Sequence, residues 1–307
     1  MPEEDILYHY TSVDALYNII TTKKLWLVNS KSSNDKTEDV LNEDDFNHLI
    51  KRSREKAPEN DKEIFDKIFC QTERTLEAEP EDEYIFCLSK IEDSLARWDR
   101  YADYRKGVCL HIDISQLKKI YDMLDLIYYE YFKIYELGYT EDVLINEILT
   151  IFDGYKRTVR DLGFSGKFND RKNEYIIGAR KRLHSSLCSK KKKPYFQDEK
   201  EVRIIYKSSY ISFGMDFVNC IFNSEGMKSR HLDFLHKLDL EKLYFASIRG
   251  EIRGMHHLNL SQIWGSDLIP EIMLEPNCSQ NAGELRAFLN AHGLKETTIS
   301  VSKIPIR

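Results

Sequence analysis

The chain lacks the short motifs that identify the commonest enzyme and cofactor families. It contains no G-x-G-x-x-G segment, no P-loop, no G-x-S-x-G turn and no protein-kinase signature. Its six cysteines include no C-x-x-C pair, and its nine histidines include no H-E-x-x-H segment. Structural zinc is therefore not expected, no metal cofactor is predicted, and the cysteines are expected to be reduced.

Long apolar runs and an excess of basic charge are also missing. No stretch approaches the roughly 20 apolar residues that a membrane helix needs. The chain starts with acidic residues (Glu3, Glu4, Asp5) instead of a basic signal-peptide start, so we expect a cytoplasmic protein. With 45 Lys+Arg against 51 Asp+Glu, the net charge of -6 argues against a globally basic nucleic-acid coat protein.

The chain does contain enough apolar material, 42% of 307 residues, for a large core. The pattern predicts an α+β fold, a sheet core in a single domain over residues 1–307 with a helical insertion at about 115–188, where no strand pattern is evident. Two surface helices are expected within 37–83. The other predicted helices are 14–22, 94–104 and 283–291, and the predicted strands are 6–12, 25–29, 84–89, 107–112, 201–206, 243–246, 269–274 and 298–301.

The end of the first predicted strand, Tyr8-His9-Tyr10-Thr11, is a first candidate for a functional site. Strand alternation places His9 on the face opposite Tyr8 and Tyr10, and side chains at a strand end can meet a ligand. A histidine in this position is also commonly a structural residue. Both interpretations stay open.

A second candidate is the segment from Glu199 to Arg203. A period of two puts Glu199, Glu201 and Arg203 on one face, so two carboxylates and a guanidinium converge at the start of an apolar strand. Paired carboxylates cost free energy unless a cation compensates them, and Arg203 is such a cation. The alternative is an edge strand with a solvated charged face.

Two further segments carry weaker signals. Ser89 ends a predicted buried strand and precedes a predicted helix that contains Arg97, Trp98 and Tyr101. Two aromatic residues at the spacing of Trp98 and Tyr101 usually belong to a core. Four lysines (190–193) precede Tyr195 and Phe196. Such a run is usually only solvated, but it can also attract a phosphate-rich ligand.

Taken together, these segments resemble a bacterial family known as domain of unknown function 2971, over nearly the whole chain. The chain departs from the family pattern at Lys36, Val202, Ile306 and Glu275-Pro276. The segments that carry the resemblance are, in chain order, Leu7–Ser12, Leu25–Leu27, Asn34–Glu38, Phe86–Ser89, Trp98–Tyr101, Gly107–Leu110, Glu199–Arg203 and Ser302–Arg307.

That family is in turn similar to the ADP-ribosyltransferases, whose first strand carries a His or Arg and whose late strand begins with the catalytic Glu. The resemblance implies a split β-sheet core and NAD as substrate. It implies that Glu201, Glu199 and His9 are catalytic. The residues implied to bind NAD are His9, Tyr10, Thr11, Ser89, Trp98, Tyr101 and Arg203, and those implied to bind the acceptor are Lys192, Lys193, Tyr195 and Phe196.

The chemistry of NAD explains why a carboxylate is central. Cleavage of the nicotinamide glycosidic bond builds positive charge on the ribose, and the leaving group departs from a cationic state without a general acid. An ionised carboxylate beside the ribose 2'-hydroxyl, here Glu201, holds the sugar and stabilises the transition state. His9 is expected to bond the ribose, and Glu199 to orient an acceptor.

Three classes of function follow. The leading hypothesis is an ADP-ribosyltransferase, a toxin or anti-phage effector that modifies a nucleic acid or protein; an NAD glycohydrolase is its close rival. The second class is a noncatalytic module that binds a nucleotide or a partner protein, with Glu201 paired only to Arg203. A nuclease ranks last because no acidic metal-binding motif supports it. The enzyme hypothesis requires His9, Ser89 and Glu201 around one cleft.

Overall fold

The computed structural model describes residues 6–30, 41–70, 83–117, 132–161, 179–180, 183–184, 186–188, 190–192, 194–207, 237–240, 242–248 and 250–304. The strands are β1 (Ile6–Thr11), β2 (Lys24–Asn29), β3 (Glu83–Ser89), β4 (Val108–Asp113), β5 (Phe132–Glu136), β6 (Glu201–Lys207), β7 (Tyr244–Ile248), β8 (Glu251–Asn259), β9 (Glu271–Leu274) and β10 (Thr298–Val301). The α-helices are α1 (Val13–Thr22), α2 (Glu43–Lys56), α3 (Lys62–Phe69), α4 (Leu95–Tyr101), α6 (Glu141–Asp161) and α10 (Ala282–Ala291), with short 3₁₀ helices η2 (Glu59–Asp61) and η3 (Pro194–Glu199).

The chain divides into two compact units. Unit 1 comprises Met1–Ser33, Asp82–Glu136 and Asp198–Arg307, and unit 2 comprises Asn34–Glu81 and Leu137–Gln197. Unit 2 is thus assembled from two stretches of sequence, and the insertion expected at 115–188 overlaps only the second of them.

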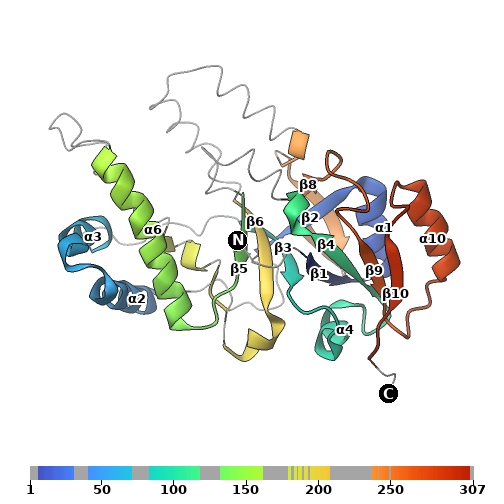
Figure 1. Cartoon of the computed structure of the whole chain (residues 1–307), viewed down its shortest axis with the longest axis horizontal. Coiled ribbons are helices and arrows are strands. Elements are labelled where there is room, and N and C mark those ends of the chain that lie inside the picture. The colour runs from blue at the N-terminus through green and yellow to red at the C-terminus, as the bar shows by residue number, and fades with distance from the viewer. Residues whose placement is uncertain are drawn as a thin grey trace. The chain divides into compact units, whose positions relative to one another are not determined.

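Unit 1 is built on one sheet, and its mixture of strands and helices confirms the α+β class (Figure 1). The described residues form ten strands, eight of which pair in the order β10-β9-β4-β1-β3-β2-β8-β7. The other two extend from β3, with β6 paired to β3 and β5 paired to β6. Neighbouring strands run antiparallel except for β9 and β10, which are parallel. Most strands are therefore joined to partners that are distant in sequence.

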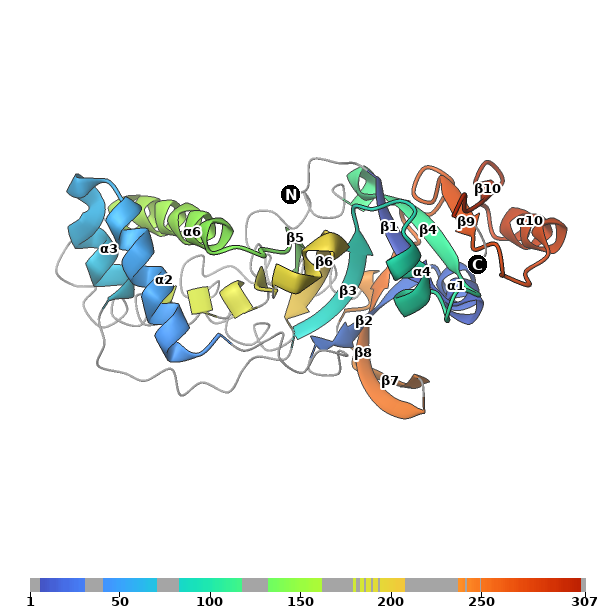
Figure 2. The same ribbon diagram turned by 90° about the horizontal axis from the view of Figure 1, so that it is seen from below.

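Strand β3 is the centre of this sheet because it has partners on both edges. One edge pairs with β6 over its whole length, from Glu83 with Lys207 to Ser89 with Glu201. The other edge is shared: β2 pairs at Ile85 and β1 pairs at Ser89. The two strands therefore separate along β3, and we call the stretch between Ile85 and Ser89 the fork. Figure 2 shows β1 and β2 leaving β3 in different directions, with β8 and β7 continuing beyond β2 as a curled hairpin.

The two faces of the sheet bury different sets of side chains. One face, which we call the core face, contains the main hydrophobic core, with α1 and α10 packed on it. The opposite face, which we call the α4 face, carries a smaller cluster beneath α4. Representative core-face residues are Leu7, Phe86, Leu88, Leu110, Val202 and Ile204, and the α4-face cluster comprises Tyr10, Trp98, Ala102, Cys109 and Met273.

Unit 2 is helical in the part that is described. Helices α2, α3 and α6 pack through their apolar stripes, and Figure 1 shows α2 and α3 (blue) beside α6 (green). Phe65 lies between Phe69 and Phe152, with ring centroids 5.1 and 4.9 Å away. The two helices expected within 37–83 are confirmed as α2 and α3. No helix in the described ranges of either unit is long and apolar enough to span a membrane.

Two strands were missed by the sequence pattern. Residues 115–188 were expected to contain no strand, but β5 lies there and pairs with β6. Its Phe132 and Ile134 alternate into the main core, a pattern too short to separate from the helical spacing around it. The hairpin strand β8 was also missed, and it carries the His256-His257 pair. His256 is buried on the core face against Tyr84 and Tyr206.

The turn from α4 into β4 depends on a glycine. After α4 the chain passes through Asp103, Tyr104 and Arg105, all in the left-handed region with φ of 47°, 53° and 67°. It then brings Gly107 against β1, where an added Cβ would lie 2.1 Å from the Thr11 carbonyl oxygen. A side chain at residue 107 would therefore force β1 and β4 apart.

We expect Gly107→Ala to destabilise the protein by about 2 kcal/mol or more, because the contact is with backbone that cannot rotate away. The matched control is Gly154→Ala in the exposed face of α6, where an added Cβ meets no atom within 4 Å. That change should stabilise the protein by up to about 1 kcal/mol through helix propensity. Denaturant unfolding measures both, and equal effects of the two substitutions would contradict this account of the turn.

Candidate functional site

One row of paired residues crosses β1, β3 and β6 at the end of the fork. Tyr8 pairs with Ser89, and Ser89 pairs with Glu201. Directly paired residues of antiparallel strands point to the same face, so all three side chains belong to the α4 face. Tyr10 and Arg203, each two residues further along its strand, share that face. The structure thus brings most of the predicted NAD-binding residues of unit 1 to one side of the sheet.

Glu201 and Arg203 form a buried ion pair on this face. The Arg203 Nε–H donates to the Glu201 carboxylate at 2.6 Å, and the side chains are only 2% and 4% exposed. The expectation that Arg203 compensates a carboxylate is therefore confirmed, whereas the alternative of a solvated charged face is wrong for these two residues. Separating a buried pair is costly because each charge loses its compensation.

Glu199 lies beside this pair, at the end of η3, in a small polar cluster. Its carboxylate accepts hydrogen bonds from the Tyr101 hydroxyl at 2.8 Å and from Arg100 at 3.1 Å. Its backbone carbonyl accepts from the fully buried Ser89 hydroxyl at 3.1 Å. The Ile91 N–H in turn donates to that hydroxyl. The end of β3, the start of β6 and α4 are thereby tied together at one point.

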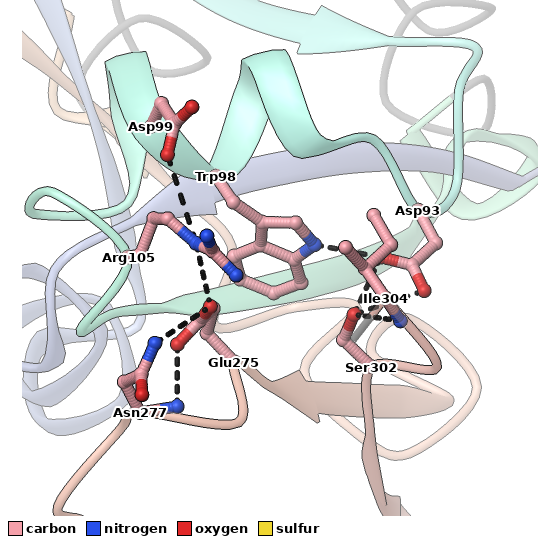
Figure 3. A network of polar contacts seen from close by, with 8 residues as sticks. All are labelled: Asp93, Trp98, Asp99, Arg105, Glu275, Asn277, Ser302 and Ile304. Atoms are coloured by element: carbon pink, nitrogen blue, oxygen red, sulfur yellow. Dashed lines mark hydrogen bonds and ion pairs between the residues drawn. The ribbon is translucent and has the colours of Figure 1, made fainter. Parts of the chain in front are cut away.

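Helix α4 is anchored on the sheet by two acidic residues outside it (Figure 3). Asp93 accepts from the Trp98 indole N–H at 2.6 Å, from the Ser302 hydroxyl and from the Lys303 N–H. Glu275 accepts from Arg105 at 3.0 Å and from the Asn277 N–H. Figure 3 shows the Trp98 ring between these two networks. They bind the chain after β9 and the chain after β10 to α4.

Trp98 and Tyr10, both predicted to bind NAD, are core residues of the α4 face. Their rings meet edge to face at 4.9 Å, and the Tyr10 hydroxyl donates to the carbonyls of Ile91 and Glu92. Trp98 is 1% exposed. Their observed contacts position α4 and the loop before it.

His9 lies on the other face of the sheet from Glu201. Its ring stacks on Phe86 of the main core at 4.1 Å, and its Nδ1–H donates to the Cys87 carbonyl at 2.9 Å. Burial lowers the pKa of His9 to about 4, against a smaller opposing effect of that hydrogen bond. The Cys87 carbonyl lies in the fork, so His9 satisfies it with a side chain. Thr11 shares the core face with His9 and is buried.

His111 lies on the same face of the sheet as Glu201. It pairs with Tyr8 across β4 and β1, and the two rings meet edge to face at 4.8 Å. Its Nδ1 lies 3.6 Å from the Glu271 carboxylate, and burial lowers its pKa. Sequence alternation places His111 in a strand, but its sharing a face with Glu201 depends on the pairing order of four strands, which no local pattern shows.

The predicted acceptor-binding residues belong to unit 2. Lys192 is buried, with its ammonium 4.9 Å from the centre of the Phe196 ring. Tyr195 is 66% exposed and lies against Phe196. Lys193 lies outside the described residues. Of the other lysines in the run, Lys190 pairs with Glu147 and Lys191 with Asp45. These are contacts within unit 2, as expected of a structural role.

No group of three or more His, Cys, Asp or Glu side chains within the described ranges is arranged to hold a metal ion. The candidate site residues on the α4 face are two carboxylates, their two arginines, a serine and a tyrosine. These side chains can form hydrogen bonds to hydroxyl groups and can compensate charge.

Comparison with known families matches residues 97–204 to the family described as "Protein of unknown function (DUF2971)". The matched segment extends from α4 to β6 and contains Trp98, Tyr101, Glu199 and Glu201. It supports the resemblance to that family that the motifs indicate. The chain matches none of the curated proteins and none of the solved structures with which it was compared.

We expect Asp93→Asn to destabilise unit 1 by about 2 kcal/mol, because an amide replaces an ionised acceptor of the Ser302 and Lys303 donors. Asp99→Asn is the matched control on α4, since Asp99 is 53% exposed and lies 3.6 Å from Arg105. It should change the free energy of unfolding by less than about 1 kcal/mol. Denaturant unfolding compares the two, and an effect of Asp93→Asn no larger than the control would contradict the anchoring role.

His9 should also contribute to acid sensitivity. Its pKa of about 4 in the folded state lies below the ordinary value of 6.5, so between these pH values the unfolded chain binds a proton that the folded chain excludes. Stability then falls as the pH decreases through this window, by at most about 1.4 kcal/mol per pH unit from this residue. In His9→Phe the slope of unfolding free energy against pH should be smaller. An unchanged slope would refute the burial of a neutral His9.

Proposed function

We propose that unit 1 is an ADP-ribosyltransferase-like module that binds NAD or a related nucleotide without breaking its glycosidic bond. The sheet divides at the fork, which is consistent with the split-sheet core that the resemblance implies. Ser89, Glu199 and Tyr101 lie together at the end of the fork, on the α4 face. These are groups that can bond ribose hydroxyls.

The observation that carries this proposal is the Glu201–Arg203 ion pair. Cleavage of NAD requires a carboxylate that is available to the ribose, whereas the Glu201 carboxylate accepts a charge-assisted hydrogen bond from Arg203 and is almost fully buried. His9, the second residue expected at the reacting ribose, lies on the opposite face against Phe86. The arrangement therefore favours binding over turnover.

The second candidate is turnover of NAD, either as an ADP-ribosyltransferase or as an NAD glycohydrolase. It is favoured by the proximity of Glu199 to Glu201, because the first carboxylate can orient a nucleophile while the second stabilises the ribose cation. For this function Arg203 would have to release Glu201. The macromolecular acceptor, nucleic acid or protein, and the role as a toxin or antiviral defence effector remain predictions of the resemblance.

Calorimetric titration of the full chain with NAD, together with chromatographic detection of nicotinamide, tests both candidates. We expect wild type to bind NAD and to release no nicotinamide. Tyr101→Phe should weaken NAD binding by about tenfold, the equivalent of one hydrogen bond. Tyr17→Phe is the matched control, because Tyr17 is 57% exposed on α1 and stacks on Phe288.

The remaining outcomes are decisive. Nicotinamide release by wild type that Glu201→Gln abolishes would establish turnover and contradict the proposal. Because Glu201→Gln leaves Arg203 without its charge partner and can lower stability, Tyr101→Phe is assayed for release in parallel. If wild type binds no NAD and releases no nicotinamide, both nucleotide functions are contradicted.

A further inference from the structure

Arg97 is a buried cation to which neither the fold nor the predicted site gives a role. It lies in the middle of α4 and is 6% exposed. Its Nε and Nη2 atoms are buried and have no hydrogen-bond partner in the described part of the chain. The guanidinium lies over the Tyr101 ring, with its carbon 5.4 Å from the ring centre. A guanidinium buried with donors unsatisfied costs free energy that the ring contact only partly offsets.

The neighbouring carboxylates of Asp93 and Glu199 accept hydrogen bonds from other donors. Asp93 accepts from Trp98, Ser302 and the Lys303 backbone. Glu199 accepts from Arg100 and Tyr101. Arg100 and Arg105, the next two arginines along the chain, are ion-paired with Glu199 and Glu275. The Nε and Nη2 donors of Arg97 have no such partner among the described residues. The charge of Arg97 also acts on the α4 face, where it opposes the rise in pKa that burial causes at Tyr10 and Cys109.

From this geometry we infer that Arg97 is an anion-binding residue that takes a phosphate or diphosphate group of the ligand. A guanidinium presents several N–H donors in one plane and matches two phosphate oxygens at once. Binding such a group would satisfy the Nε and Nη2 donors and neutralise the charge. The inference deepens the proposed function, on which it rests for the identity of the ligand: in NAD the group is the diphosphate. Arg97 contacts the Tyr101 ring, and the Tyr101 hydroxyl donates to Glu199, so the inferred anion site adjoins the cluster around Glu199.

The test uses pyrophosphate as a probe, so that the anion site is measured without a nucleoside. Wild-type full-length protein should bind pyrophosphate in calorimetry, and its melting temperature should rise with pyrophosphate concentration. Arg97→Met should weaken binding by at least tenfold and remove the rise. Arg97→Lys, which keeps the charge but loses the planar fork, should bind with intermediate affinity.

Stability of the ligand-free protein separates a binding residue from a structural one. Removing an uncompensated buried charge should leave the melting temperature of Arg97→Met equal to or above that of wild type. Arg253→Met is the matched control, because Arg253 is ion-paired with Glu251 on β8. It should leave pyrophosphate binding unchanged. A melting temperature of Arg97→Met well below wild type would indicate a structural arginine and overturn the inference.

The probe also separates this inference from the proposed function. Pyrophosphate binding that depends on Arg97, with no binding of NAD, would retain the anion site and refute the NAD proposal. Equal NAD affinities of wild type and Arg97→Met would retain the proposed function and refute the role of Arg97. Absence of pyrophosphate binding by wild type, or equal binding by Arg97→Met, would also overturn the inference.

Discussion

The pairing of β3 with β6 on one edge and with both β1 and β2 on the other is the constraint on which the site depends. Strand register fixes the face of every side chain, because a shift of one residue exchanges the two faces. The pairs Tyr8 with Ser89 and Ser89 with Glu201 therefore decide that Glu201 shares a face with α4. The same register places His9 on the core face, against Phe86.

Charge compensation explains how this face keeps several ionic groups out of water. Glu201 is paired with Arg203, and Glu199 with Arg100 and the Tyr101 hydroxyl, so each of these buried carboxylates has a donor at hydrogen-bond distance. Asp93 and Glu275 likewise accept hydrogen bonds, and these bonds join α4 to the segments after β9 and β10. Within the described residues the Nε and Nη2 atoms of Arg97 have no acceptor, and a bound anion would supply one.

The sequence predicted the elements of unit 1 better than their arrangement. Apolar alternation located β1, β3, β4 and β6, and the i, i+3 spacing of Trp98 and Tyr101 located α4, because these signals are local. β5 was missed because five alternating residues lie within helical spacing, and β8 was missed in a stretch with no apolar run. The Arg203 partner of Glu201 followed from period two alone. The separation of His9 from Glu201 did not, since it depends on which strands pair and in what register.

The central claim is that the α4 face binds an intact nucleotide while the Glu201–Arg203 pair stays formed. A crystal structure of the full chain with NAD tests it most directly. We predict intact NAD on the α4 face, with its diphosphate bonded to Arg97 and the Glu201 carboxylate still bonded to Arg203. Cleaved NAD, or a Glu201 carboxylate turned from Arg203 to the nicotinamide ribose, would contradict the account.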